Sequence, residues 1–179
     1  MTNKNLITYE EAAARIGTLP TLEPRPNTRN LRALIKCLTE AVQEIPSFQS
    51  IKYGYMGMVV TPEEYALTGE TAWQDFPDPG FHRPLGGNAT EQRDAETEFQ
   101  ARKTIYASQE NVRNAINKAL TKAVPASFRR AGGAVGPAVY TATDDPGAIL
   151  LDLQRRYGKA TPTEKNSSGS LLEGSVEPW

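Results

Sequence analysis

Apolar residues recur at helical spacing over much of the chain, most regularly between residues 28 and 45. There they fall three or four positions apart, which places them on one face of a helix. The positions are Leu31, Leu34, Ile35, Leu38, Val42 and Ile45. Thr28 is the expected N-cap and Pro46 the expected stop. The pattern predicts an amphipathic helix whose apolar face is buried.

A shorter helix is expected over residues 8–16. Thr8 followed by Glu11 is typical of a capping box, in which each side chain bonds the backbone N–H of the other residue, and Gly17 is a typical stop. Residues 18–27 contain three prolines. They therefore predict an extended linker before the next helix.

The longest helical pattern begins after Thr90 and continues to Ala123, with Pro125 as its stop. Its apolar face comprises Ala95, Phe99, Ile105, Val112, Ile116, Leu120 and Ala123. An unbroken helix over 91–123 would be about 50 Å long, so we expect a bend near Ser108. A last helix is expected after Asp145 and Pro146, with Ile149, Leu150, Leu153 and Tyr157 on one side and Gly158 at its end.

The segment YGYMGMVVTPEEYALTG, residues 53–69, has no charge before Glu63. Thr61, Pro62 and Glu64 predict a helix start, so residues 53–60 are expected to be extended or irregular, with a possible short β segment. Two interpretations stay open: burial against the helix over 29–45, or an exposed subunit contact, since exposed apolar patches mark interfaces. The candidate interface residues are Tyr55, Met56, Met58, Val59 and Tyr65.

These elements predict an all-α fold, a small bundle of about five helices. An N-terminal helix and linker would occupy residues 1–27 and a helical domain residues 28–158. Residues 69–90, with three prolines and four glycines, predict a long loop. Residues 159–179 are polar and without periodicity, which predicts a disordered tail.

Composition narrows the class of protein. The 179 residues carry a net charge of −1 and one cysteine, Cys37, so no intramolecular disulfide forms and a reducing compartment is expected. The N-terminus lacks the apolar core of a signal peptide, and no apolar run reaches the ~20 residues of a membrane helix. We therefore expect a cytoplasmic protein without a membrane partner.

Catalytic and ligand-binding signals are weak. The one histidine, His82, has no nucleophile or orienting acid nearby in sequence, and one His with one Cys cannot form a structural zinc site. The glycine-rich AGGAVGP lacks the lysine of a phosphate loop. We predict no enzyme activity, cofactor, metal or small-molecule substrate. Weak RNA contact is assigned to Arg129, Arg130, Arg155 and Arg156.

The order of several segments resembles the Gag-like region of copia-type retrotransposon polyproteins. They are GYMGMVVTPEEYAL, DPGFHRP, ATEQRDAETEFQARKTIY, NVRNAINKALTKAVPASF and DPGAILLDLQRRYGKATPTE, within residues 28–165. The resemblance implies an all-α capsid-type domain that self-associates around element RNA. It also implies that the helix over 148–158 closes this lobe. Family members continue into a second lobe and a Cys/His knuckle, so the likeness is to a truncated member. The alternative is a host-adopted helical protein-interaction module.

Overall fold

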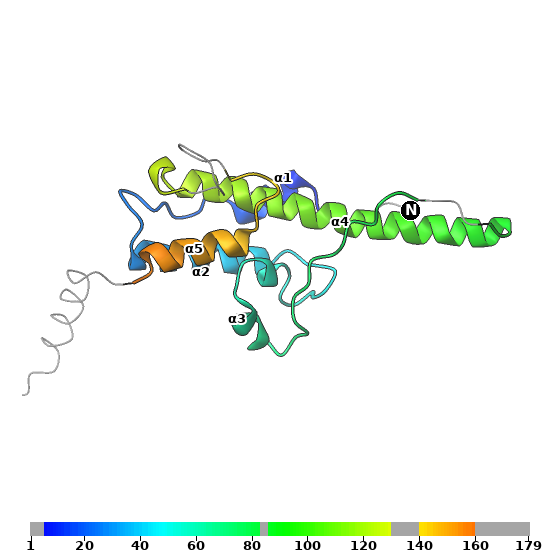
Figure 1. The fold of residues 1–179 in the computed structure, drawn as a ribbon, viewed down its shortest axis with the longest axis horizontal. Coiled ribbons are helices and arrows are strands. Elements are labelled where there is room, and N and C mark those ends of the chain that lie inside the picture. The colour runs from blue at the N-terminus through cyan, green and yellow to red at the C-terminus, as the bar shows by residue number, and fades with distance from the viewer. Residues whose placement is uncertain (1–5, 83–85, 130–139, 160–179) are drawn as a thin grey trace, which may run out of the picture.

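The computed structural model describes residues 6–82, 86–129 and 140–159, and this part of the chain is entirely helical and irregular, without a strand (Figure 1). The α-helices are α1 (Tyr9–Ile16), α2 (Thr28–Gln43), α3 (Pro62–Ala66), α4 (Ala89–Ala123) and α5 (Pro146–Tyr157). Two 3₁₀ turns, η1 (Met56–Met58) and η2 (Ala126–Phe128), lie between them. The predicted all-α bundle of about five helices is confirmed.

Local capping signals fix where the helices begin. Thr8 and Glu11 form the predicted capping box, with Glu11 N–H donating to Thr8 Oγ1 at 3.2 Å and Thr8 N–H donating to Glu11 Oε2 at 3.0 Å. The cap of α2 is Asn27 and not Thr28, because the amide oxygens of Asn27 and Asn30 accept each other's backbone N–H groups. The prediction for α2 was therefore wrong by one residue at its start.

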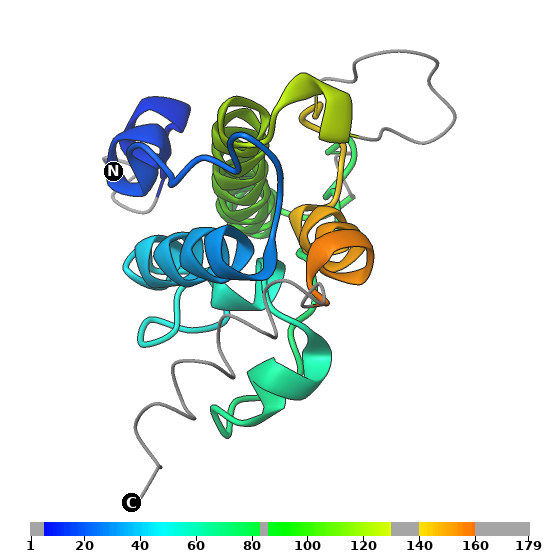
Figure 2. The same ribbon diagram turned by 90° about the vertical axis from the view of Figure 1, so that its left-hand side faces the viewer.

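The core lies where α1, α2 and α5 surround the second half of α4 (Figure 2). The apolar positions predicted for this helix are buried: Leu34, Leu38 and Val42 of α2, and Ile45 just beyond its end, are fully inaccessible to solvent, and Ile35 is partly exposed. Each fully buried aliphatic side chain stabilises the fold by about 1.5–3 kcal/mol. Leu19 and Leu22 of the predicted linker are buried in the same core, so the segment before α2 is packed on the bundle.

Helix α4 has 35 residues and continues through Ser108, where a bend was predicted, as one unbroken element (Figure 1). Its length is therefore about 52 Å at 1.5 Å per residue. The buried positions are concentrated in the second half, from Ser108 to Ala123, while Phe99 is the one buried residue before them. The first half of α4 consequently extends beyond the bundle.

The segment over residues 53–60 is buried and helical in character, and the possible β segment is wrong. Its amides bond locally, Met58 N–H to the Tyr55 carbonyl at 3.0 Å and Val59 N–H to the Met56 carbonyl at 3.1 Å, so no ladder partner is needed. Gly54, at φ +50°, lies so close to the end of α2 that a Cβ there would come within 2.7 Å of three carbonyl oxygens. A glycine is therefore required at this crossing.

After this segment, α3 begins at the predicted capping box of Thr61 and Glu64, with Pro62 at its first position. The predicted disordered tail comprised residues 159–179, of which residues 160–179 lie outside the described part of the chain. Arg130 also lies outside the described residues.

Candidate interaction site

A stretch of loop between α3 and α4, residues 71–76, is held across the bundle by side-chain amides; we call it the strap. At its first end, Gln49 Nε2 donates to the carbonyls of Thr71 at 2.7 Å and Ala72 at 3.3 Å. Gln49 Oε1 accepts from Gln74 N–H at 3.2 Å. One glutamine thus pairs with the strap backbone much as a neighbouring strand would.

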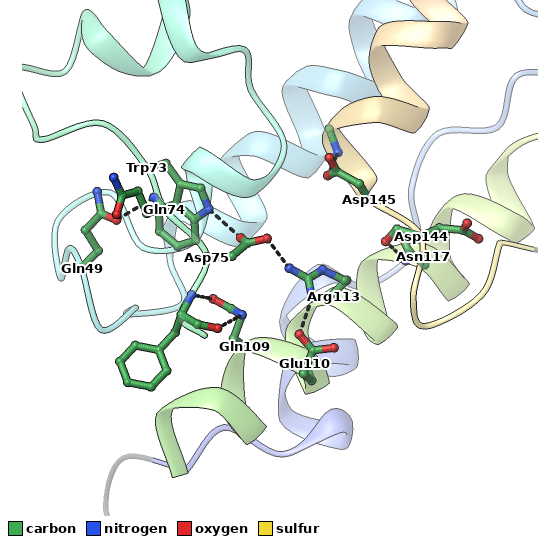
Figure 3. Close-up of polar contacts among 12 residues, drawn as sticks. Gln49, Trp73, Gln74, Asp75, Gln109, Glu110, Arg113, Asn117, Asp144 and Asp145 are labelled. Carbon is green, nitrogen blue, oxygen red and sulfur yellow. Dashed lines mark hydrogen bonds and ion pairs between the residues drawn. The ribbon is translucent and has the colours of Figure 1, made fainter. Parts of the chain in front are cut away.

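A second glutamine repeats this arrangement at the other end of the strap (Figure 3). Gln109 of α4, 1% exposed, accepts from Phe76 N–H at 2.7 Å and donates to the Phe76 carbonyl at 3.1 Å. Because a buried amide left without partners is costly, Gln109 and Phe76 stabilise each other. The strap is therefore fixed at both ends.

Trp73 lies between these two ends, at the centre of an aromatic cluster. Its ring centroid is 5.7 Å from that of Phe48, 5.9 Å from Tyr55 and 6.1 Å from Tyr65, in tilted or edge-on arrangements. Such geometry is the favoured one for aromatic pairs. A Cβ on Gly57 would lie 2.5 Å from the Cβ and Cγ of Trp73, so the tryptophan packs directly on the glycine backbone.

A chain of polar contacts leads from Trp73 to α4 (Figure 3). Trp73 Nε1 donates to Asp75 Oδ1 at 3.1 Å, and Arg113 donates to Asp75 Oδ2 at 2.8 Å. Arg113 also pairs with Glu110, one turn back on α4. The Arg113 side chain is only 13% exposed, whereas that of Asp75 is 57% exposed. The Asp75 carboxylate is therefore exposed to solvent, and its bonds to Trp73 and Arg113 orient it.

The start of α5 is positioned by Asn117, a fully buried residue of α4. Asn117 Nδ2 donates to the carbonyls of Thr141 at 2.7 Å and Asp144 at 2.8 Å, which fixes the turn before the helix. Asp145 follows this turn and caps α5, accepting from Gly147 N–H at 3.0 Å. Asn117 thereby sets where the Asp145 carboxylate lies.

A groove of about 370 Å³ opens between η1, the strap and the first turns of α5. Its apolar wall includes Met58, Val60, Pro62, Trp73, Ala148 and Leu151. Asp75 on the strap and Asp145 at the start of α5 are its charged lining residues. Pockets of roughly 300–1,000 Å³ with apolar walls and few polar groups are typical binding sites. This groove suits an apolar group accompanied by positive charge.

The candidate interface residues of the sequence are mostly inside the protein. Tyr55, Met58, Val59 and Tyr65 are 1–4% exposed, and only Met56 is partly accessible. The interpretation as an exposed subunit contact is therefore wrong at the four buried positions, because Tyr55 and Tyr65 support Trp73 and the others pack in the core. The alternative interpretation, burial against α2, is the one observed.

The basic residues assigned to RNA contact have different surroundings. Arg156 donates to Asp152 at 2.6 and 2.9 Å, to the Phe128 carbonyl at 3.0 Å and to Tyr157 Oη at 3.1 Å. These bonds hold η2 against α5 and leave Arg156 little capacity for phosphate. Arg155 is exposed and Arg129 partly buried. Among the described residues, the arginines assigned to RNA contact do not form one free basic cluster.

Two buried tyrosines have perturbed ionisation. Burial raises the pKa of Tyr55 to about 12. Burial likewise raises the pKa of Tyr140 to about 12, against the opposing effect of the nearby Arg156 and Arg129 cations. Both phenols stay protonated at neutral pH, so their role is in packing. His82 stacks on Phe99 with ring centroids 5.1 Å apart, and Cys37 is a partly buried free thiol.

No family model, curated protein or solved structure matches this chain. Within the described ranges, no helix is both long and apolar enough to cross a membrane. The same residues contain no cluster of three or more His, Cys, Asp or Glu arranged to hold a metal ion. The fold and the groove are therefore the observations on which a function can be argued.

Sequence reasoning missed the groove. It placed Trp73 and Asp75 in a long loop and assigned no role to Gln109, Arg113 or Asn117. The sequence does contain one signal, which is the placement of the amide side chains of Gln109 and Asn117 on a face of α4 otherwise made of Val, Ala, Ile and Leu. A buried amide needs hydrogen-bond partners, so Gln109 and Asn117 indicate that loops cross α4 at those points.

Proposed function

We propose that the chain is a Gag-like structural protein of the capsid type, which acts by binding further copies of itself. The order of sequence segments that resemble this family supports the proposal, as does the all-α bundle. The observation that carries it is the exposure of large apolar side chains. Ile51, Leu67 and Phe81 are 83%, 88% and 96% exposed.

Two of these side chains belong to loops that are bonded together. Ile51 follows Ser50, whose hydroxyl donates to Glu70 at 3.4 Å, and Leu67 precedes Glu70 by three residues. Both loops are adjacent to the Gln49 contacts with the strap. Contiguous exposed apolar surface on a soluble domain is a common mark of a protein–protein interface. Each of these two loops presents one large, exposed apolar side chain.

The alternative proposal is a host-adopted interaction module, in which the same exposed side chains bind a different protein. Weak RNA contact through Arg155 and Arg129 is a secondary part of the Gag-like proposal, and a cytoplasmic location stays a prediction. Mutation of Met58 would be a poor test of either proposal, because Met58 is 4% exposed and its loss would disturb the core.

Multi-angle light scattering of the full chain tests the proposal. We expect the weight-average mass to rise as the protein concentration increases from low micromolar to near millimolar. Because burial of apolar surface drives the contact, the rise should persist when salt screens surface charges. A mass equal to the monomer at every concentration would contradict self-association and favour the interaction-module alternative.

A further inference from the structure

We propose that Phe81 of one copy binds in the groove between the strap and α5 of a second copy. This inference rests on the proposed function, since it names the contact through which self-association would occur.

The exposure of Phe81 is imposed by its neighbours in the chain. His82 is stacked on Phe99 of α4 at 5.1 Å, and Gly80 N–H donates to Asp78 Oδ1 at 2.9 Å. Gly80 has a positive φ of 69°, which turns the backbone directly before Phe81. With both neighbours held, the Phe81 ring is left 96% exposed.

Phe81 cannot fill the groove of its own chain while these contacts last. Phe76 is fixed to Gln109, and His82 is fixed to Phe99. Gln109 and Phe99 are ten residues apart on one helix, which corresponds to about 15 Å. The loop after the strap thus runs along α4, away from α5 (Figure 1). A second molecule is needed to bring the two surfaces together.

The groove has the size and lining that an aromatic anchor requires. Its volume of about 370 Å³ is within the range of pockets that enclose small organic groups. Met58, Pro62 and Leu151 offer apolar contacts, and the Trp73 ring lines the same space. Large aromatic side chains placed in such pockets commonly supply most of the binding energy of an interface.

The two surfaces are different parts of the molecule, so the contact is heterologous. Each copy can donate its Phe81 and receive another, and such contacts build rings when the rotation closes and open filaments when it does not. A single interface of this type is enough to produce assemblies larger than dimers.

Mixing two variants tests the pairing. Phe81→Ser removes the anchor, and Ala148→Arg fills the groove from an exposed position on α5. Ala14→Arg, at an exposed position of α1 outside the groove, is the matched control. All three sites are exposed, so folding should be retained, as circular dichroism would verify. Sedimentation velocity of each variant and of the equimolar mixture gives the masses.

We expect Phe81→Ser and Ala148→Arg each to be monomeric where the wild type and Ala14→Arg assemble. Their mixture should give species of twice the monomer mass and nothing larger, because one intact groove and one intact Phe81 remain. Assembly of Phe81→Ser like the wild type, or a mixture that stays monomeric, would overturn the pairing while leaving self-association intact. A wild type that is monomeric throughout would instead overturn the proposed function.

Discussion

Replacing Gly57 with alanine tests the contact that fixes Trp73 on the bundle. Gly57 does not need a positive φ, so alanine is compatible with its backbone. The added Cβ would nevertheless lie 2.5 Å from Trp73 Cβ and Cγ and 2.6 Å from Cδ2. These atoms are the base of the side chain, so the whole strap has to move. Overpacking of this kind costs about 1–3 kcal/mol.

The measurement is the free energy of unfolding in urea, followed by far-ultraviolet circular dichroism. Gly86→Ala is the control, because no atom lies within 4 Å of a Cβ at that position. We expect Gly57→Ala to lose about 1–3 kcal/mol and Gly86→Ala to lose less than about 0.5 kcal/mol. Equal losses in the two variants would contradict the close contact.

A double-mutant cycle assigns the loss to Trp73. Trp73→Gly removes the ring and the Cβ, and so removes every atom that approaches Gly57 most closely. In that background Gly57→Ala should cost less than about 0.5 kcal/mol, which gives a coupling of about 0.5–3 kcal/mol. The same cost with and without the Trp73 side chain would refute the reasoning, because the strain would then lie elsewhere.

Three further predictions concern buried polar groups. Tyr55→Phe should be less sensitive to alkaline unfolding than the wild type. With a folded pKa of about 12 and an unfolded pKa of 10.0, ionisation of Tyr55 should lower the wild-type free energy of unfolding by about 1.3 kcal/mol between pH 9 and 11. An identical loss in the variant would contradict this. Gln109→Ala should speed hydrogen exchange at Phe76 N–H, whereas Gln100→Ala, at an exposed position of α4, should not; equal protection in both would argue against the strap contact. Asn117→Ala should lower the free energy of urea unfolding by about 1–3 kcal/mol by unpairing two carbonyls, and a loss below about 0.5 kcal/mol would be inconsistent with the bonds described.

The features that sequence predicted well are governed by near neighbours. The capping boxes at Thr8 and Thr61 join residues three positions apart, so the local sequence contains both partners. The cap of α2 was misplaced because Asn27 and Thr28 are both good N-caps, and the partner that decides between them is Asn30. The spacing of the apolar residues in α2 likewise predicts which face of the helix is buried.

The features that sequence did not predict depend on residues far apart in the chain. Burial of residues 53–60 was one of two options, and the choice depends on Gly54 meeting the carbonyls at the end of α2. The contact between Asp75 and Arg113 spans 38 positions, and that between Phe76 and Gln109 spans 33. Nothing in the spacing of these residues indicates their pairing, so the groove could be found only from the fold.

The proposed function requires that this helical molecule bind other copies of itself through its exposed apolar side chains. Sedimentation velocity of the unmodified full chain over a wide concentration range measures this most directly. We predict a sedimentation coefficient that increases with concentration and falls back to the monomer value on dilution. A single boundary at the monomer value, unchanged at the highest concentration reached, would contradict self-association.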